Sequence, residues 1–160
     1  MCVVDGDESQ LYDYRLMTHT IATIQRVAAM DTPWYVMAGF RRPHRAFQVH
    51  QKYWDLYPDS AVFATAKHKT RSESQPLVAF HAASFALPNG STYNGNPDLP
   101  WPTDIQQVAR KAYAACVTQT DSYVGQVLNT LDATGQADKT IVVLHSGTPH
   151  SPFVLQSPPT

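Results

Sequence analysis

The 160-residue sequence has few of the features that most readily identify a class of protein. Its two cysteines, Cys2 and Cys116, lie in unrelated contexts, so they give neither zinc-site spacing nor a disulfide framework. Cys116 falls within a helical pattern, where we expect a small buried hydrophobe rather than a reactive thiol. No apolar run approaches membrane-spanning length. Residues 1–7 have no basic region or apolar stretch, so we expect no signal peptide there.

Net charge is also nearly absent. Twelve Lys and Arg residues oppose 13 Asp and Glu residues, for a formal charge of -1. Proteins that bind nucleic acid usually carry a strongly basic surface, so we expect no nucleic-acid partner. The sequence does have 43% hydrophobic residues, enough to bury the core of one domain.

The most informative stretch is residues 38–47, with the sequence AGFRRPHRAF. It follows an apolar run at 34–38, whose aromatic and β-branched residues predict a buried strand. Pro43 cannot donate to a sheet and predicts a loop. Ligands of open α/β sheets bind just past the carboxyl ends of strands. This loop carries Arg41, Arg42, His44 and Arg45. Guanidinium groups pair well with oxyanions, so we expect the loop to contact a sulfate or phosphate group.

Apolar residues at helical spacing predict two helices. The first runs from about residue 18 to residue 30, and the second covers residues 104–134. Thr103 and Gln106 have the spacing of a capping box at the start of the second helix. Gly135 is suited to end it.

A second apolar run, residues 141–145, is rich in β-branched residues and is typical of a strand buried on both faces. Together with the strand at 34–38 and the helix between them, it predicts a βαβ unit. Val3 and Val4 allow a further short strand near the start of the chain.

Weaker patterns cover the remaining segments. Residues 49–58 predict a short helical turn whose aromatic side chains pack on the body. Residues 59–102 contain five prolines and turn signals such as Asn89-Gly90, and predict a long irregular connection. Within it, the basic run Lys67–Arg71 is expected to be a solvated loop. Residues 147–160 contain four prolines and are expected to be irregular.

Three blocks share the pattern of a known family. Residues 39–47 follow the pattern Gly-aromatic-x-x-Pro-His-x-x-Phe, and residues 52–58 end in Tyr-Pro. Residues 113–125 follow a helix pattern close to Tyr-x-Ala-x-Val-x-x-x-Asp-x-x-Val-Gly, and residues 131–144 supply a helix end and strand. In this order they resemble the type I sulfatases of the alkaline-phosphatase superfamily, most of all the iduronate-2-sulfatase group. The resemblance covers about residues 18–146.

The resemblance implies an α/β fold, a partial alkaline-phosphatase-like sandwich with a mostly parallel sheet flanked by helices. Residues 1–146 would form part of a sulfatase catalytic domain. Residues 147–160 would form a proline-rich tail that departs from the family. Family habit implies a lysosomal, secreted or periplasmic location, which no residue of the chain specifies.

The resemblance also implies hydrolysis of a sulfate ester, such as a sulfated carbohydrate. In the family, a formylglycine made within a Cys/Ser-x-Pro-x-Arg signature attacks the sulfur, and a calcium ion polarises the sulfate. By position, His44 matches the histidine that contacts the sulfate. Its neighbours Arg41, Arg42 and Arg45 are expected to contact substrate.

Parts of this machinery are missing from the sequence. Residues 74–78 begin like the nucleophile signature but have Val78 in place of its arginine. Where the family continues with an Asp-His pair after residue 146, this chain has Gly147-Thr148-Pro149-His150, so no metal ligand is assigned. We therefore expect a sulfatase segment that is inactive and marginally folded on its own.

Two other functions are compatible with the same residues. One is a phosphoesterase of the same superfamily, because the basic loop suits phosphate equally well. The other is a non-catalytic module that binds anionic glycans through the loop arginines and the Lys67–Arg71 run. For His44, the residues alone favour a hydrogen bond to backbone, whereas the resemblance favours sulfate contact.

Overall fold

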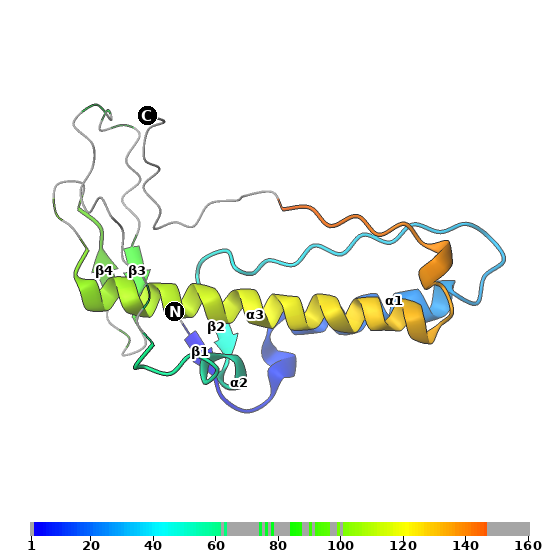
Figure 1. The fold of residues 1–160 in the computed structure, drawn as a ribbon, viewed down its shortest axis with the longest axis horizontal. Coiled ribbons are helices and arrows are strands. Elements are labelled where there is room, and N and C mark those ends of the chain that lie inside the picture. Colours follow the sequence, from blue (N-terminus) through cyan, green and yellow to red (C-terminus); the bar gives the residue numbers. More distant parts are fainter. Residues whose placement is uncertain are drawn as a thin grey trace.

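Helix α3 (Thr103–Ala133) is the axis of the molecule, and the other described elements lie along it (Figure 1). The structure is a computed structural model that describes residues 2–61, 63, 74, 76, 78, 84–87, 90, 92–96, 99 and 101–146. The predicted basic loop Lys67–Arg71 and the predicted tail 147–160 lie outside the described residues. No described helix is both long enough and apolar enough to span a bilayer.

The boundaries of α3 agree closely with the prediction, but its start differs in detail. Thr103 is the first helical residue rather than the cap, and no side chain caps the helix. The predicted capping box is therefore wrong, and the Gln106 side chain instead donates to the Trp101 carbonyl at 2.7 Å. At the other end Gly135 has φ of 66°, a left-handed conformation that favours glycine, which confirms it as the stop.

Helix α1 (Tyr12–Val27) runs behind the C-terminal half of α3 (Figure 1). It begins six residues before the predicted start at residue 18 and ends before Met30. Its buried residues fall on one helical face: Asp13, Met17, Thr20 and Ile24. The early start escaped the prediction because the first buried position of this face holds Asp13, a charged residue.

The core depends on small side chains on α3. Ala109, Ala112, Ala115 and Cys116 are all fully buried. Because these side chains are short, the chain around Phe47 and Val49 can approach the helix backbone closely. Burial raises the pKa of the Cys116 thiol to about 12, which confirms Cys116 as a buried hydrophobe.

A small parallel sheet lies against this face. Strand β1 (Cys2–Val4) pairs with β2 (Gln48–His50), with Val3 opposite Val49. Parallel strands need a long crossover, which α1 and the segment after it supply. The short strand predicted at Val3 and Val4 is thus confirmed, and α2 (Gln51–Trp54) confirms the predicted helical turn.

Two other strands form within the segment that was predicted to be irregular. Strand β3 (Ser84–Ala86) pairs antiparallel with β4 (Thr92–Asn94). The turn signal between them is confirmed at Gly90, whose φ is 83°. The prediction missed the pair because each strand has only three residues, too few to show a periodicity.

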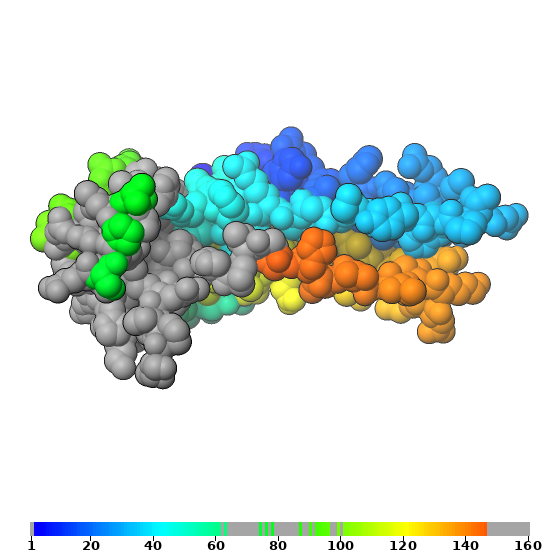
Figure 2. Space-filling view, turned by 90° about the horizontal axis from the view of Figure 1, so that it is seen from above, coloured from blue at the N-terminus to red at the C-terminus, as the bar shows by residue number. Residues whose placement is uncertain are grey.

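The strands predicted at 34–38 and 141–145 do not form. Both segments are extended, and they run side by side along α3 (Figures 1 and 2). Tyr35 is 83% exposed and Ile141 is 92% exposed, so neither run is buried. Apolar composition indicates a strand only if neighbouring strands cover it, and none does so in the described part of the chain. The predicted βαβ unit is therefore wrong here, and the parallel pair that forms is β1–β2.

A buried tyrosine ties the start of the chain to α3. Tyr123 is fully buried and its hydroxyl donates to Glu8 at 2.7 Å, while Lys52 pairs with the other oxygen of the same carboxylate. Burial alone would raise the pKa of Glu8, but the hydrogen bonds from Lys52 and Tyr123 outweigh it and lower the pKa. Folding thus favours the ionised form of the Glu8 carboxylate over its protonated form.

We expect the free energy of unfolding to fall as the pH drops from 4.5 through the lowered pKa of Glu8. The unfolded chain takes up that proton first, so acid favours unfolding. Urea unfolding at a series of pH values should show a shallower acid slope for Glu8→Gln, and the wild-type slope for the exposed control Asp5→Asn. An unchanged slope in Glu8→Gln would contradict this role.

Candidate functional site

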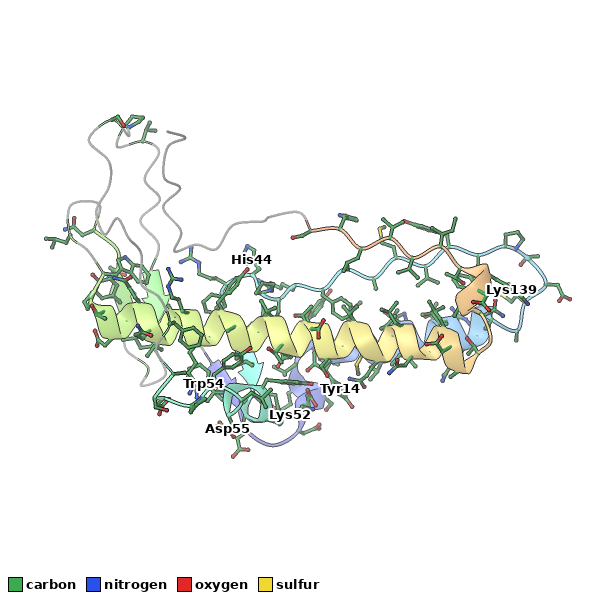
Figure 3. The ribbon with its side chains drawn as sticks, viewed as in Figure 1. Tyr14, His44, Lys52, Trp54, Asp55 and Lys139 are labelled. Atoms are coloured by element: carbon green, nitrogen blue, oxygen red, sulfur yellow. The ribbon has the colours of Figure 1, made fainter. Side chains whose placement is uncertain are left out.

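The basic loop predicted from the sequence occupies residues 41–47, between the extended segment and β2. It makes a tight turn in which the His44 amide donates to the Arg41 carbonyl at 2.9 Å. His44 lies on the opposite side of α3 from Lys52, Trp54 and Asp55 (Figure 3). The turn therefore presents its residues on the same side of α3 as the two extended segments (Figure 1).

Asp13, which the sequence analysis did not single out, holds the start of this loop. Its side chain is 2% exposed and lies in the first turn of α1. One carboxylate oxygen accepts from the Arg41 amide and the other from the Arg42 amide, both at 2.9 Å. A carboxylate that accepts two backbone N–H groups fixes two successive peptide units. No short motif marks this pairing, because the residues lie 28 and 29 positions apart.

Arg42 holds the loop from inside. It is 8% exposed, and its guanidinium donates to the Gln48 carbonyl at 3.3 Å and to the His44 carbonyl at 3.4 Å. A third bond reaches the Gln48 side chain. Burial lowers the pKa of Arg42, and the nearby Asp13 carboxylate partly offsets that effect. The position of Arg42 favours a structural role, since its guanidinium faces the protein rather than solvent.

Polar residues of α3 bond to Arg42 near the start of the loop and to β2, which directly follows the loop. Gln119 is 1% exposed, accepts from the His50 amide at 2.8 Å and donates to the Gln48 carbonyl at 3.4 Å. The Thr120 hydroxyl donates to the Arg42 carbonyl at 3.4 Å. The loop is thus anchored at both ends, by α1 and by α3.

His44 is the exposed histidine at the apex of this anchored loop. Its Nδ1 contacts the Arg45 carbonyl, so Nδ1 carries a hydrogen and donates. The other ring nitrogen, Nε2, lies on the opposite edge of the ring. In the protonated ring Nε2 also carries a hydrogen, which an oxyanion can accept.

The other predicted substrate contacts differ in exposure. Arg41 is exposed and Arg45 is half-buried, whereas Arg42 is buried. The structure thus brings the four predicted residues into one loop but places them in different surroundings. The cationic guanidinium groups of Arg41 and Arg45 can favour an anion near the loop.

The described residues do not form a metal centre. No group of three or more His, Cys, Asp or Glu side chains is arranged to hold a metal ion in the part of the chain that the structure describes. The calcium ion implied by the family resemblance therefore finds no fitting ligand set here.

Comparison with known proteins gives a consistent result. The sequence profile of the sulfatase family matches residues 5–148. Iduronate 2-sulfatase of Mus musculus is 27% identical over 148 residues, which are 90% of this chain and 26% of that protein. Iduronate 2-sulfatase of Homo sapiens is 25% identical over 147 residues, with the same shares of 90% and 26%. A sulfatase of Formosa agariphila is 31% identical over 114 residues, 71% of this chain and 21% of that protein.

The chain spans about a quarter of the length of the curated relatives it matches. The family implies an alkaline-phosphatase-like fold, and the described residues supply a mixed α/β arrangement with a small parallel pair packed on helices. The match includes the anchored loop and all of α3. This chain therefore belongs to the sulfatase family.

Proposed function

We propose that residues 1–146 form part of a sulfatase catalytic domain and that His44 contacts the sulfate group of the substrate. The observation that carries the proposal is the exposed His44 in a loop that buried side chains hold on both sides, Asp13 at Arg42 and Gln119 at His50. Functional side chains are often carried by loops that a rigid scaffold holds in position.

The proposed role of His44 is electrostatic. With Nδ1 facing the Arg45 carbonyl, Nε2 is the ring nitrogen left to face a sulfate oxygen, and it donates to that oxygen when it carries a hydrogen. Arg41 and Arg45 add positive charge to the same loop. A donor that is already oriented stabilises charge on the sulfate oxygens while the sulfur is attacked and the alcohol leaves, without further rearrangement. The sequence contains no Cys/Ser-x-Pro-x-Arg nucleophile signature, so this segment supplies recognition and charge stabilisation.

The proposed substrate is a sulfated carbohydrate. The relatives that match over 90% of this chain are named iduronate 2-sulfatase, which supports a sulfated sugar. A choline-sulfatase of Rhizobium meliloti is 28% identical over 115 residues, a smaller share of 71% of the chain.

Thermal unfolding in sulfate tests the role of His44. We expect about 50 mM sulfate, compared with chloride at equal ionic strength, to raise the Tm of the wild-type chain by a few degrees, because a ligand that binds only the folded state stabilises it. His44→Ala should lose most of this gain. His19→Ala, which alters an exposed histidine of α1, should keep it.

The control separates specific binding from a salt effect. Sulfate stabilises many proteins because it is excluded from their surfaces, and that part of the gain is common to all three chains. An equal gain in wild type, His44→Ala and His19→Ala would contradict the proposal. A larger gain in phosphate than in sulfate would instead favour a phosphoesterase.

A further inference from the structure

We propose that Asp13 is a positioning residue that holds His44 in its sulfate-contacting place. This inference rests on the proposed function of His44. Asp13 is 2% exposed, so it acts through the loop and not on the substrate.

Two routes of contact lead from Asp13 to His44. The first runs through the backbone: Asp13 accepts from the Arg41 amide, and the Arg41 carbonyl accepts from the His44 amide, each at 2.9 Å. The second runs through Arg42, whose amide also donates to Asp13 at 2.9 Å and whose guanidinium donates to the His44 carbonyl at 3.4 Å. Both the amide and the carbonyl of His44 are therefore fixed by groups that Asp13 holds.

The geometry requires a carboxylate rather than any polar side chain. Two N–H donors approach two separate oxygens, so both positions must accept. An asparagine offers one oxygen and one NH₂ group, and the NH₂ group would face a backbone N–H. Because the position is buried, water cannot readily supply the lost acceptor.

The negative charge of Asp13 has a second role. Arg42 is buried, and Asp13 is the charged group that opposes the effect of this burial on its pKa. Without the carboxylate, the positive charge of the buried Arg42 guanidinium would be uncompensated. This favours movement of the guanidinium toward solvent, away from the His44 carbonyl to which it donates. A single carboxylate on α1 thus acts on the loop in two ways, through its hydrogen bonds and through its charge.

The test compares Asp13→Asn with Tyr123→Phe in the full 160-residue chain. Tyr123→Phe is the matched control because it also removes a buried hydrogen bond, and that bond reaches Glu8 rather than a residue of the loop. The readout is the sulfate dissociation constant from the NMR signals of the His44 ring, at a temperature where each chain is folded. We expect Asp13→Asn to weaken sulfate binding by about tenfold, and Tyr123→Phe to leave it unchanged.

The outcomes separate this inference from the proposed function. If wild type and Asp13→Asn bind sulfate with the same dissociation constant, the positioning role is overturned. His44 would then remain as a sulfate contact. Absence of binding in wild type would overturn the function of His44 and the positioning role with it. If Asp13→Asn does not fold, Asp13→Ser takes its place, since it removes the charge and leaves one oxygen where the carboxylate has two. Wild-type affinity in that variant would equally overturn the inference.

Discussion

Replacing Phe47 with alanine is expected to lower the free energy of unfolding by about 3–5 kcal/mol. Phe47 is 1% exposed and lies at the end of the anchored loop, directly before β2. Its ring makes an edge contact with Tyr113, with the centroids 6.3 Å apart. The small residues of α3 that receive it cannot expand to fill the space, so the substitution leaves a cavity.

Urea unfolding followed by circular dichroism measures this loss. Leu144→Ala is the control, because Leu144 is 82% exposed and its removal should change stability by no more than about 0.5 kcal/mol. Phe47→Leu keeps most of the volume and should cost less than Phe47→Ala. A loss below about 1 kcal/mol for Phe47→Ala would show that the loop does not pack on α3 as described.

The two cysteines are expected to differ in reactivity by at least about a thousandfold at pH 8. The thiolate is the reactive form, and the pKa of Cys116 is raised to about 12, chiefly by burial. Cys116 is also fully buried, whereas Cys2 is exposed. A thiol reagent such as DTNB should therefore modify one thiol per chain rapidly, and the second only when the protein unfolds.

Single-cysteine variants make this test unambiguous. Cys2→Ser should remove the fast phase, and Cys116→Ala should remove the phase that requires denaturant. The same burial has a pH consequence: above pH 9, the ordinary value for Cys116, the unfolded chain loses a proton that the folded chain keeps. Stability should then decline as the pH rises from 9 toward about 12. Rapid modification of both thiols in native protein would contradict the burial of this face of α3.

The helix α3 and the loop of His44 could be predicted because their signals are local. The stop at Gly135 and the break at Pro43 depend on the conformations that single residues allow. The role of Asp13 could not be predicted, because its two hydrogen bonds cross 28 and 29 positions and involve backbone groups that every residue has. For the same reason the sequence does not distinguish the buried Arg42 from the exposed Arg41.

For the two extended segments, the sequence predicted strands that do not form. The apolar runs at 34–38 and 141–145 have the composition of buried strands, and they lie side by side (Figure 2). Yet Met37 is 78% exposed and Leu144 is 82% exposed. A strand is a property of a pair, because its backbone groups must bond to a neighbour. Composition shows that a segment is suited to form a strand. In the described residues, no strand is hydrogen-bonded to either of these two segments.

The central claim is that His44 contacts sulfate, and an NMR titration of the histidine rings with sulfate tests it most directly. His19 and His145 are exposed and provide internal references within the same sample. We predict that the ring signals of His44 shift and saturate with sulfate, while those of His19 and His145 follow only the small, unsaturating change caused by ionic strength. Parallel, unsaturating shifts of all three rings would contradict the claim, and the anchored loop would then have to be explained without an anion.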